Sequence, residues 1–558
     1  SASVAIGNST TASGGSSVSI GAYNKANGQS SFALGESTIA NGKYSQALGY
    51  GTVANGTSSI AIGYESRTNG PYALAQGYRS YANGIASIAM GYQAKACGLY
   101  SISLGQQNYA YGKNSLAVGY KSYANTAYSI AIGREVTSVG DTSIAIGRGT
   151  VASGESSVAL GYSTTASGGS STAMGTGTRA SGSFSTAIGC ATRALQSMST
   201  AMGIATTATG YTSTAMGSTT TASGFVSTAM GLGTKALGSI STAMGSGTTA
   251  SGINSTAMGY FTTASGDYST AMGFFTTASG NYSTAMGWKS IASGNYSTAM
   301  GNRTTTLGLN STAMGMATKA SGESSTAMGH ETNAGGKYST SMGYQTLSCG
   351  TSSIAIGYQS RTNGPYALAQ GYQSYANGIA SIAMGYQAKA CGMYSVSLGQ
   401  QNYAQGSNSF AAGHNSTASG IISTAIGESS QAFKMYSVSI GSSSTSDGDY
   451  AVAIGRVVTA SGESSVALGD LSKASGKYSI AIGKSVTASS YGETALGLYT
   501  TTPQRYPPLS ETEFNSKDRL FVIGNGTGLG GARRDALVML KNAETTLYGN
   551  MNIVGSLN

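Results

Sequence analysis

The sequence predicts an all-β solenoid, because one short motif returns at a fixed interval along most of the chain. The motif Ser-x-Ala-(Ile/Leu/Met/Val)-Gly recurs every 14 residues, and its closing glycine runs from Gly7 to Gly497 without an insertion or a deletion. Its 36 copies cover nearly nine tenths of the 558 residues. A fixed period of this kind indicates stacked structural repeats. The strict period also argues against disorder, although 83 residues are glycine and only 9% are charged.

Each repeat is predicted to contain two short strands, each ended by a glycine. In the copy from Ser269 to Gly280 the two runs are STAMG and FTTAS, which are too short for a helix and rich in β-branched and small residues. A recurring glycine suits a positive φ or a close approach of the next coil. With strands about 4.8 Å apart, 36 coils predict a rod of roughly 170 Å. The second glycine is replaced at only four positions: Thr126, Gln196, Lys434 and Ser490.

The first strand of the repeat is almost free of charge. Glu493 is the one charged residue in its 36 copies, so both faces of this strand are expected to be buried. A coil of two strands buries only one of those faces, which predicts an oligomer with the first strand at a shared axis. The face that points to the axis stays open at this stage. We expect Ala173→Lys to disrupt assembly and Arg179→Ala to change little. The second strand is the predicted outer wall, because its positions hold Lys25, Arg67, Lys95, Arg179, Lys235 and Lys319.

The repeats resemble those of a known family. The segments SVAIG at 3–7 and SIAIG at 59–63 and 129–133 are similar to the head repeats of YadA-like trimeric autotransporter adhesins. The resemblance covers residues 1–497, and it implies a left-handed parallel β-roll, a homotrimeric rod and a surface or fibre role. The candidate trimer and core positions are Ser171, Ala173, Met174, Gly175, Ser269, Ala271, Met272 and Gly273.

Aromatic residues provide candidate ligand-facing positions. The Tyr-, Asn- and Gln-rich block at 59–112 returns nearly unchanged at 353–406, either as a duplication that lengthens the rod or as a binding face displayed twice. Tyr64, Tyr92 and Trp288 each follow a strand glycine and are candidates to face a surface glycan or matrix ligand. The aromatic column formed by Tyr268, Tyr282 and Tyr296 is expected to stack from coil to coil and stabilise the rod, with a carbohydrate-binding strip as the alternative.

The composition changes after Gly497. Residues 498–517 hold three of the five prolines and predict a linker. Residues 518–558 predict a small β module with strands at 518–523, 535–540 and 545–554, and they resemble a module near the C-termini of trimeric fibre proteins. No apolar run is long enough for a transmembrane helix, and neither a heptad stalk nor anchor strands are recognisable. No signal peptide precedes the repeats, so it was removed or the chain is an excised piece. Attachment would then require an unknown anchoring protein, another secretion route or a virion.

The sequence predicts no catalytic residue, cofactor or metal. His330 and His414 are six coils apart, and the four cysteines form no CxxC pair, so neither a zinc site nor an intrachain disulfide is expected. The glycine-rich segment 526–531 fits G-x-G-x-x-G, but a dinucleotide site also needs a βαβ unit. The cysteines are Cys97, Cys190, Cys349 and Cys391.

The function predicted from these observations is structural and adhesive. The net charge of +10 is scattered, which favours solubility over nucleic-acid binding. We expect a non-enzymatic subunit of a homotrimeric extracellular fibre that projects from a cell surface and mediates attachment. The alternative is a tail fibre or receptor-binding spike of a phage or contractile injection system. An ice-binding solenoid fits less well, since the column begun by Thr262 and Thr276 is broken at Ser290.

Overall fold

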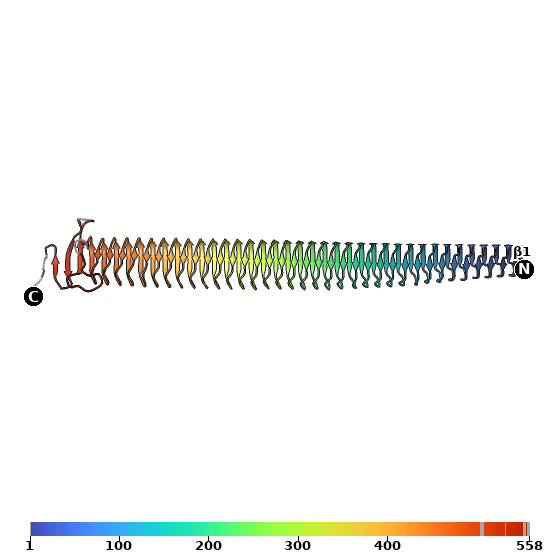
Figure 1. The fold of residues 1–558 in the computed structure, drawn as a ribbon, viewed down its shortest axis with the longest axis horizontal. Helices are drawn as coiled ribbons and strands as arrows, with labels where there is room; N and C mark the ends of the chain where they lie inside the picture. The colour runs from blue at the N-terminus through green and yellow to red at the C-terminus, as the bar shows by residue number, and fades with distance from the viewer. Residues whose placement is uncertain (1, 503–506, 530–531, 551–553, 555–558) are drawn as a thin grey trace. The chain divides into compact units, whose positions relative to one another are not determined.

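The strands that the structure describes belong to one repeating pattern and its C-terminal extension. The computed structural model describes residues 2–502, 507–529, 532–550 and 554. These residues fall into two compact units, Ser1–Ser279 and Gly280–Asn558. Within each unit, successive coils follow one another in chain order (Figure 1). The predicted all-β solenoid is confirmed, with every strand of the coils running parallel to its neighbours.

Each coil contains one long and one short strand. The odd-numbered strands from β1 (Val4–Asn8) to β71 (Thr494–Leu498) have five residues each and begin 14 residues apart. The even-numbered strands from β2 (Thr11–Ala12) to β70 (Thr487–Ala488) have two residues each and keep the same interval. The second strand is therefore shorter than predicted: in the FTTAS run only β40 (Thr277–Ala278) is strand. Corner residues occupy the remainder of that run.

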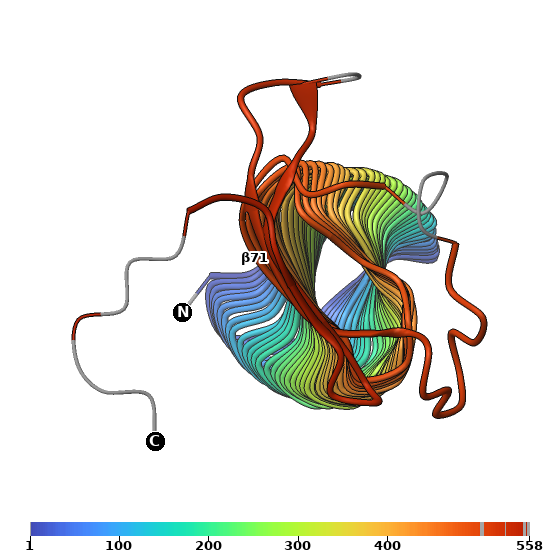
Figure 2. The ribbon, with the colours of Figure 1, turned by 90° about the vertical axis from the view of Figure 1, so that its left-hand side faces the viewer.

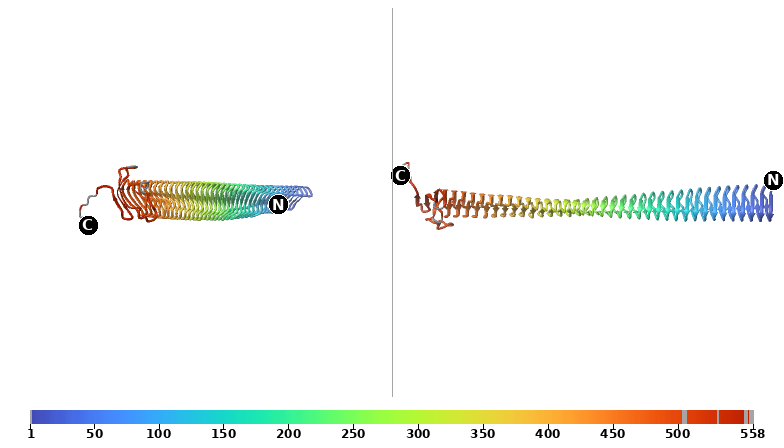
Figure 3. Two further views of the ribbon diagram at one scale, coloured as in Figure 1. Left: turned by 60° about the vertical axis from the view of Figure 1, so that its left-hand side comes forward. Right: turned by 90° about the horizontal axis from the view of Figure 1, so that it is seen from above.

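Neighbouring coils are in exact 14-residue register. The long strand β25 (Thr172–Thr176) pairs in parallel with β27 (Thr186–Cys190), so that Ala173 lies opposite Ala187 and Gly175 opposite Gly189. Within each unit the long strands form one wall and the short strands a second wall, as the end view and the two side views show (Figures 2 and 3). Each position of the coil therefore lies next to the same position of the neighbouring coil, and the side chains at that position form a row.

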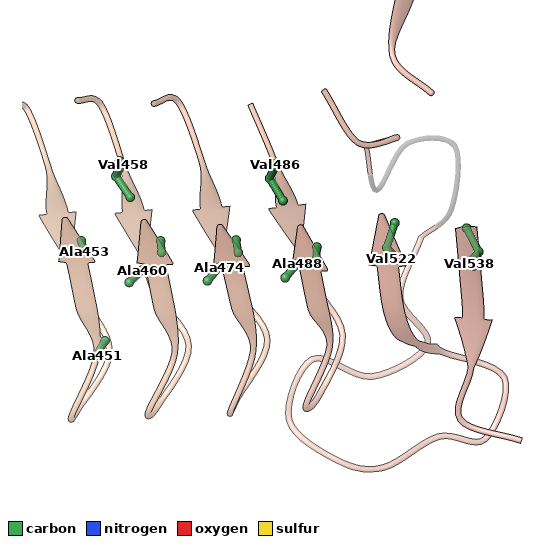
Figure 4. Close-up of a cluster of buried hydrophobic side chains, with 12 residues drawn as sticks. Ala451, Ala453, Val458, Ala460, Ala474, Val486, Ala488, Val522 and Val538 are labelled. Atoms are coloured by element: carbon green, nitrogen blue, oxygen red, sulfur yellow. The ribbon is translucent and has the colours of Figure 1, made fainter. Parts of the chain in front are cut away.

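The interior between the two walls is filled by small side chains. Ser171 and Ala173 of one long-strand motif and Ala180 of the following short strand have no exposed surface. In the last coils Ala460, Ala474 and other alanines lie along the interior together with a few valines (Figure 4). Because the two walls are so close, residues larger than valine are excluded from most interior rows. This explains the Ser-x-Ala pattern of the motif.

The two glycines of the coil have different structural roles. Gly175 has φ +116°, and a Cβ on it would lie 2.0 Å from the carbonyl oxygen of Gly189. Gly168 has no positive φ, yet a Cβ there would also lie 2.0 Å from the carbonyl oxygen of Gly182. Both glycine rows thus allow the next coil to approach, and only the strand-closing row also needs an unusual backbone conformation.

The C-terminal strands continue the wall of long strands. β72 (Arg519–Asn525) pairs in parallel with β71, with Gly524 opposite Gly497. β73 (Asp535–Leu540) and β74 (Thr545–Leu547) follow in antiparallel order. The strands expected at 518–523 and 535–540 are thus found, and the third is shorter than expected. Parts of the expected linker, glycine-rich turn and third strand (503–506, 530–531 and 551–553) lie outside the described residues.

Candidate functional site

The long strands present an apolar face on the outside of the coil. The second and fourth residues of each motif, such as Thr172 and Met174, point away from the interior because side chains alternate along a strand. Met174 and Met202 are 36% and 38% exposed, and Ile454 is 38% exposed. No charged residue occupies either row in any of the 36 coils. We call these two rows the apolar face; apart from Gln46, Gln76 and Gln370 they hold only aliphatic residues, threonine and phenylalanine.

The structure divides the candidate trimer and core positions into two groups. Ser171, Ala173, Ser269 and Ala271 are completely buried inside the coil. Met174 and Met272 lie on the outward apolar face, and Gly175 and Gly273 close their strands beside it. The choice of strand face that the sequence left open is therefore resolved for the single chain, since the Ser/Ala side is interior and the Thr/Met side is exterior.

Stacked tyrosines border the apolar face. They occupy the residue after the strand glycine, which continues the outward alternation, as in Ile60, Ile62 and Tyr64. Tyr64 and Tyr92 are 38% and 44% exposed, and the rings from Tyr50 to Tyr92 stack 4.9 Å apart. A second ladder stacks at 4.8 to 4.9 Å in the other unit and consists of His330, Tyr344, Tyr358, Tyr372 and Tyr386. Stacking was predicted for another column, and there the rings of Tyr282 and Tyr296 lie 4.9 Å apart and are stacked.

Trp288 is held between two cations of its own chain. Lys289 Nζ lies 4.5 Å and the Arg303 guanidinium 5.0 Å from the centre of the indole ring. Cation–π contacts of this kind fix the ring in place. Trp288 is half-buried, so its role as a ligand-facing residue remains a prediction that would require displacement of at least one cation.

A long polar groove runs along the corner between long and short strands in the second unit. It has a volume of about 670 Å³. One wall, which we call the amide wall, consists of Gln359, Gln373, Gln387, Gln401 and Asn415. The opposite wall, which we call the basic–aromatic wall, consists of Arg361, Tyr375, Lys389, Tyr403 and Thr417. Asn402 lies between them, and none of the lining residues is acidic.

Side-chain hydrogen bonds connect the amide wall from coil to coil. Gln373 Nε2 donates to Gln359 Oε1 over 2.8 Å, and Gln387 Nε2 donates to Gln373 Oε1 over 3.0 Å. The series continues at 3.2 Å from Gln401 to Gln387. On the opposite wall, burial and, to a smaller degree, the neighbouring Cys391 raise the pKa of Tyr403, so its hydroxyl stays protonated at neutral pH. The groove thus offers a fixed row of neutral hydrogen-bonding groups beside two cations.

The remaining candidate chemistry is dispersed. His330 belongs to a tyrosine ladder, and His414 is exposed six coils away. The four cysteines are free thiols. Within residues 2–502, 507–529, 532–550 and 554, no three His, Cys, Asp or Glu side chains gather into a metal-binding group. In the same ranges, no helix is both long and apolar enough to cross a bilayer.

The end of the solenoid contains a buried ionic cluster that sequence analysis did not find. Glu493 takes the first position of the last motif and lies 2.8 Å from Arg519 Nε in β72. Its other carboxylate oxygen accepts hydrogen bonds from the backbone N–H groups of Ser489 and Ser490. Burial raises the pKa of Glu493, and the Arg519 charge opposes that shift. The signal in the sequence was the single charge among 36 first strands, followed by the motif-like FVIG of β72.

These features define a class of protein: a parallel β-solenoid of 14-residue coils whose long strands present uncharged, largely apolar rows on the outside. The sequence-family model of the YadA head domain repeat (two copies) matches 23 segments that together cover most of residues 2–485. The chain therefore belongs to the YadA head repeat family of adhesins, as the resemblance in sequence predicted. A comparison with curated proteins returns no match.

Proposed function

We propose that the chain is a structural and adhesive subunit of a homotrimeric extracellular fibre that projects from a cell surface and mediates attachment. The observation that carries this proposal is the apolar face. It runs through all 36 coils without a charged residue, whereas the outward row of the short strands contains Lys25, Arg67 and Arg179. Soluble proteins seldom leave a large, mainly apolar surface uncovered.

Three copies of the chain are a suitable cover for this face. Self-association of the solenoid would bring the same rows of every copy to a common axis, as expected for cyclic symmetry. The side chains at the second and fourth motif positions, mainly Val, Ile, Leu, Met and Thr, would then fill the space between the long-strand walls. Membership of the YadA head family, whose members are trimeric adhesins, supports this arrangement and an extracellular location.

Adhesion is proposed from the outward-facing remainder of the coil. The corners and the short strands carry tyrosines, amides and scattered basic residues, and these stay accessible when the apolar face is covered. A surface glycan or a matrix ligand is the proposed target, and an anchoring protein is a proposed further partner. Tyr64 and Tyr92 border the apolar face, so they are proposed to contact ligand only at the rim of the assembly.

Native mass spectrometry and immunogold electron microscopy test the two parts of this proposal. We expect a trimer as the main species, and a monomer as the sole species would overturn the assembly. Antibody against residues 1–497 is expected to label fibres on cells in the unpurified source. Label confined to virions or injection particles would instead support a phage or injection-system receptor-binding fibre, and would overturn the cell-surface assignment.

A further inference from the structure

We propose that the groove lined by Gln359–Asn415 and Arg361–Thr417 binds an extended acidic polysaccharide that carries one anionic group on every second sugar. The proposal gives a ligand class to the adhesive function above and rests on it. The groove spans five coils, and its residues do not belong to the apolar face. It therefore stays available in an assembly that covers that face.

The spacing of the basic–aromatic wall selects a repeating polymer. Arg361 and Lys389 alternate with Tyr375 and Tyr403, so each kind of side chain returns after two coils. At about 4.8 Å per strand, two coils place the cations about 9.6 Å apart. This spacing is comparable with the disaccharide repeat of an extended polysaccharide. In an extended peptide, alternate side chains are only about 6.8 Å apart. The acidic side chains of a regular peptide would therefore not match the spacing of the cations.

The alternation also matches the chemistry of such a polymer. A carboxylate or sulfate would pair with Arg361 and with Lys389, both exposed, in charge-assisted hydrogen bonds. The intervening sugar would lie against Tyr375 or Tyr403, whose rings are half-buried and therefore already ordered. Arg361 Nη1 donates a 3.2 Å hydrogen bond to the Tyr375 hydroxyl, which holds the first cation and the first ring together.

The amide wall would recognise sugar hydroxyls. Each ladder glutamine uses one N–H and one acceptor site for its neighbours, so a second N–H and further carbonyl lone pairs are left for a ligand. The ladder fixes these side chains before a ligand arrives, which reduces the entropy lost on binding. The lining has two cations and no carboxylate, so an anionic chain meets no like charge there.

The duplicated block at 59–112 provides a natural comparison. It differs from 353–406 at five of 54 positions, and two of these differences fall on the amide wall, where Glu65 and Arg79 replace Gln359 and Gln373. Arg79 Nε and Glu65 Oε2 form an ion pair at 2.6 Å in place of the amide hydrogen bond. Both pairs thus connect adjacent coils, but the first block places a carboxylate where the second has a neutral amide.

This comparison supplies a matched test. The full-length trimer and three variants would be titrated with hyaluronan and chondroitin octasaccharides, cellooctaose and poly-glutamate. The double variant Gln359→Glu/Gln373→Arg gives the second block the wall of the first, so its fold is expected to be retained. The double variant Arg361→Ala/Lys389→Ala removes both cations. The variant Arg179→Ala removes an exposed cation from a coil outside the groove and is the control.

We expect at least one of the two acidic octasaccharides to bind the wild-type trimer and the Arg179 control equally. Loss of both groove cations should weaken this binding at least tenfold, because charged hydrogen bonds contribute more than neutral ones. The double variant Gln359→Glu/Gln373→Arg should weaken the binding of the acidic octasaccharide severalfold, and the mass of the trimer should stay unchanged. Absence of binding to either acidic octasaccharide, tighter binding of cellooctaose or poly-glutamate, or unchanged affinity in both double variants would overturn the proposal. Adhesion of the variants to intact cells distinguishes failure of the adhesive function from failure of the ligand assignment. If adhesion persists while the groove binds no acidic polysaccharide, the adhesive function stands without this ligand.

Discussion

Glu493 Oε1 and Arg519 Nε lie 2.8 Å apart and join the last coil of the solenoid to β72. Each residue of β71 pairs with the residue of β72 that lies 27 positions later in the chain. The other 35 coils have serine or alanine in the place of Glu493. Neither side chain is more than 5% exposed, and Arg519 also lies 4.0 Å from Asp535 of β73. The only charged residue in this strand of the repeat therefore lies in the last coil, where its ion pair attaches β72 in register.

Removal of one partner from this pair is expected to loosen the C-terminal strands. Glu493→Ser restores the residue of the other coils but leaves Arg519 buried with Asp535 as its nearest carboxylate. A buried ion that loses its partner costs about 3–5 kcal/mol. Hydrogen–deuterium exchange should show loss of protection in β72 and β73, while coils distant from the junction keep theirs, since each coil contacts mainly its neighbours.

The double variant Glu493→Ser/Arg519→Leu is the control for this prediction. It removes both charges, so it should be more protected than the Glu493→Ser variant. The single variant Arg519→Leu completes the comparison. If the loss of protection in the double variant equals the sum of the losses in Glu493→Ser and Arg519→Leu, the two side chains are not coupled and the proposed role of the pair is wrong.

Most of the coil was predictable from the sequence, because the fixed spacing and composition of the motif determine the geometry of the coil. Gly7 to Gly497 at a fixed interval predicts parallel stacking in register, and the basic residues of the second strand predict its exposure. The sequence did not distinguish the interior from the exterior side of the first strand, since alanine and methionine are both apolar. The walls are so close that Ala173 fits inside and Met174 does not. Ala173→Lys is consequently expected to disrupt the coil itself and not only the assembly.

The C-terminal junction was less predictable. Glu493 was visible as an exception, but its partner Arg519 lies in a segment that no longer has the 14-residue period. Val522 takes the interior place of the motif alanine, and Gly524 takes the place of the closing glycine. The groove was also missed. Its two walls come from residues two positions apart in each coil, and they form a continuous groove only when five coils are stacked.

Aspartates on the apolar face should disturb the proposed trimer more than they disturb the fold of the single chain. The triple variant replaces Met230, Met244 and Met258, which lie at the fourth motif position of three successive coils. Each coil would bring three carboxylates to the axis, and an ion buried without a partner costs several kcal/mol. We expect amide exchange over residues 228–260 to rise at least tenfold and the melting temperature of the trimer to fall.

The matched control places the same three charges on the short strands of the same coils, by substitution of Lys235, Thr249 and Thr263 with aspartate. Their side chains point outward from the other wall. This variant should retain the exchange rates and trimer mass of the wild type. Equal effects of the two triple variants would show that the apolar face is not at the subunit contact.

Two glycines in one coil should differ in their tolerance of alanine. In Gly175→Ala the new Cβ would lie 2.0 Å from the Gly189 carbonyl oxygen, at a backbone φ of +116°. In Gly177→Ala the nearest heavy atom would be Ala191 Cα, 4.0 Å away, at a φ of +62°, close to the +55° that Ala191 adopts in the next coil. The second substitution should cost about 1–2 kcal/mol, the usual penalty of the left-handed region. The first should abolish protection of the two adjoining coils in hydrogen exchange. Similar exchange in both variants would show that close approach of the coils does not require the glycine.

The tyrosine ladder should add measurable stability to the coils that it connects. Tyr372 stacks at 4.8 Å on Tyr358 and at 4.9 Å on Tyr386, with the ring planes within 6° of parallel. Each aromatic pair contributes about 0.5–1.5 kcal/mol beyond the area that it buries, so Tyr372→Ala is expected to cost about 1–3 kcal/mol. The measurement is the local opening free energy of amides in the adjoining coils, obtained from hydrogen exchange.

Tyr366→Ala is the control in the same coil. Tyr366 is 65% exposed, and the residues at its corner in the preceding and following coils are Ser352 and Ala380, so its row provides no ring to stack on. Its substitution should change the opening free energy by less than about 0.5 kcal/mol, as is usual for an exposed residue. If the two alanine variants open equally, the ladder does not stabilise the coils. Its tyrosines would then be better explained by contact with a ligand or with another subunit at the rim of the apolar face.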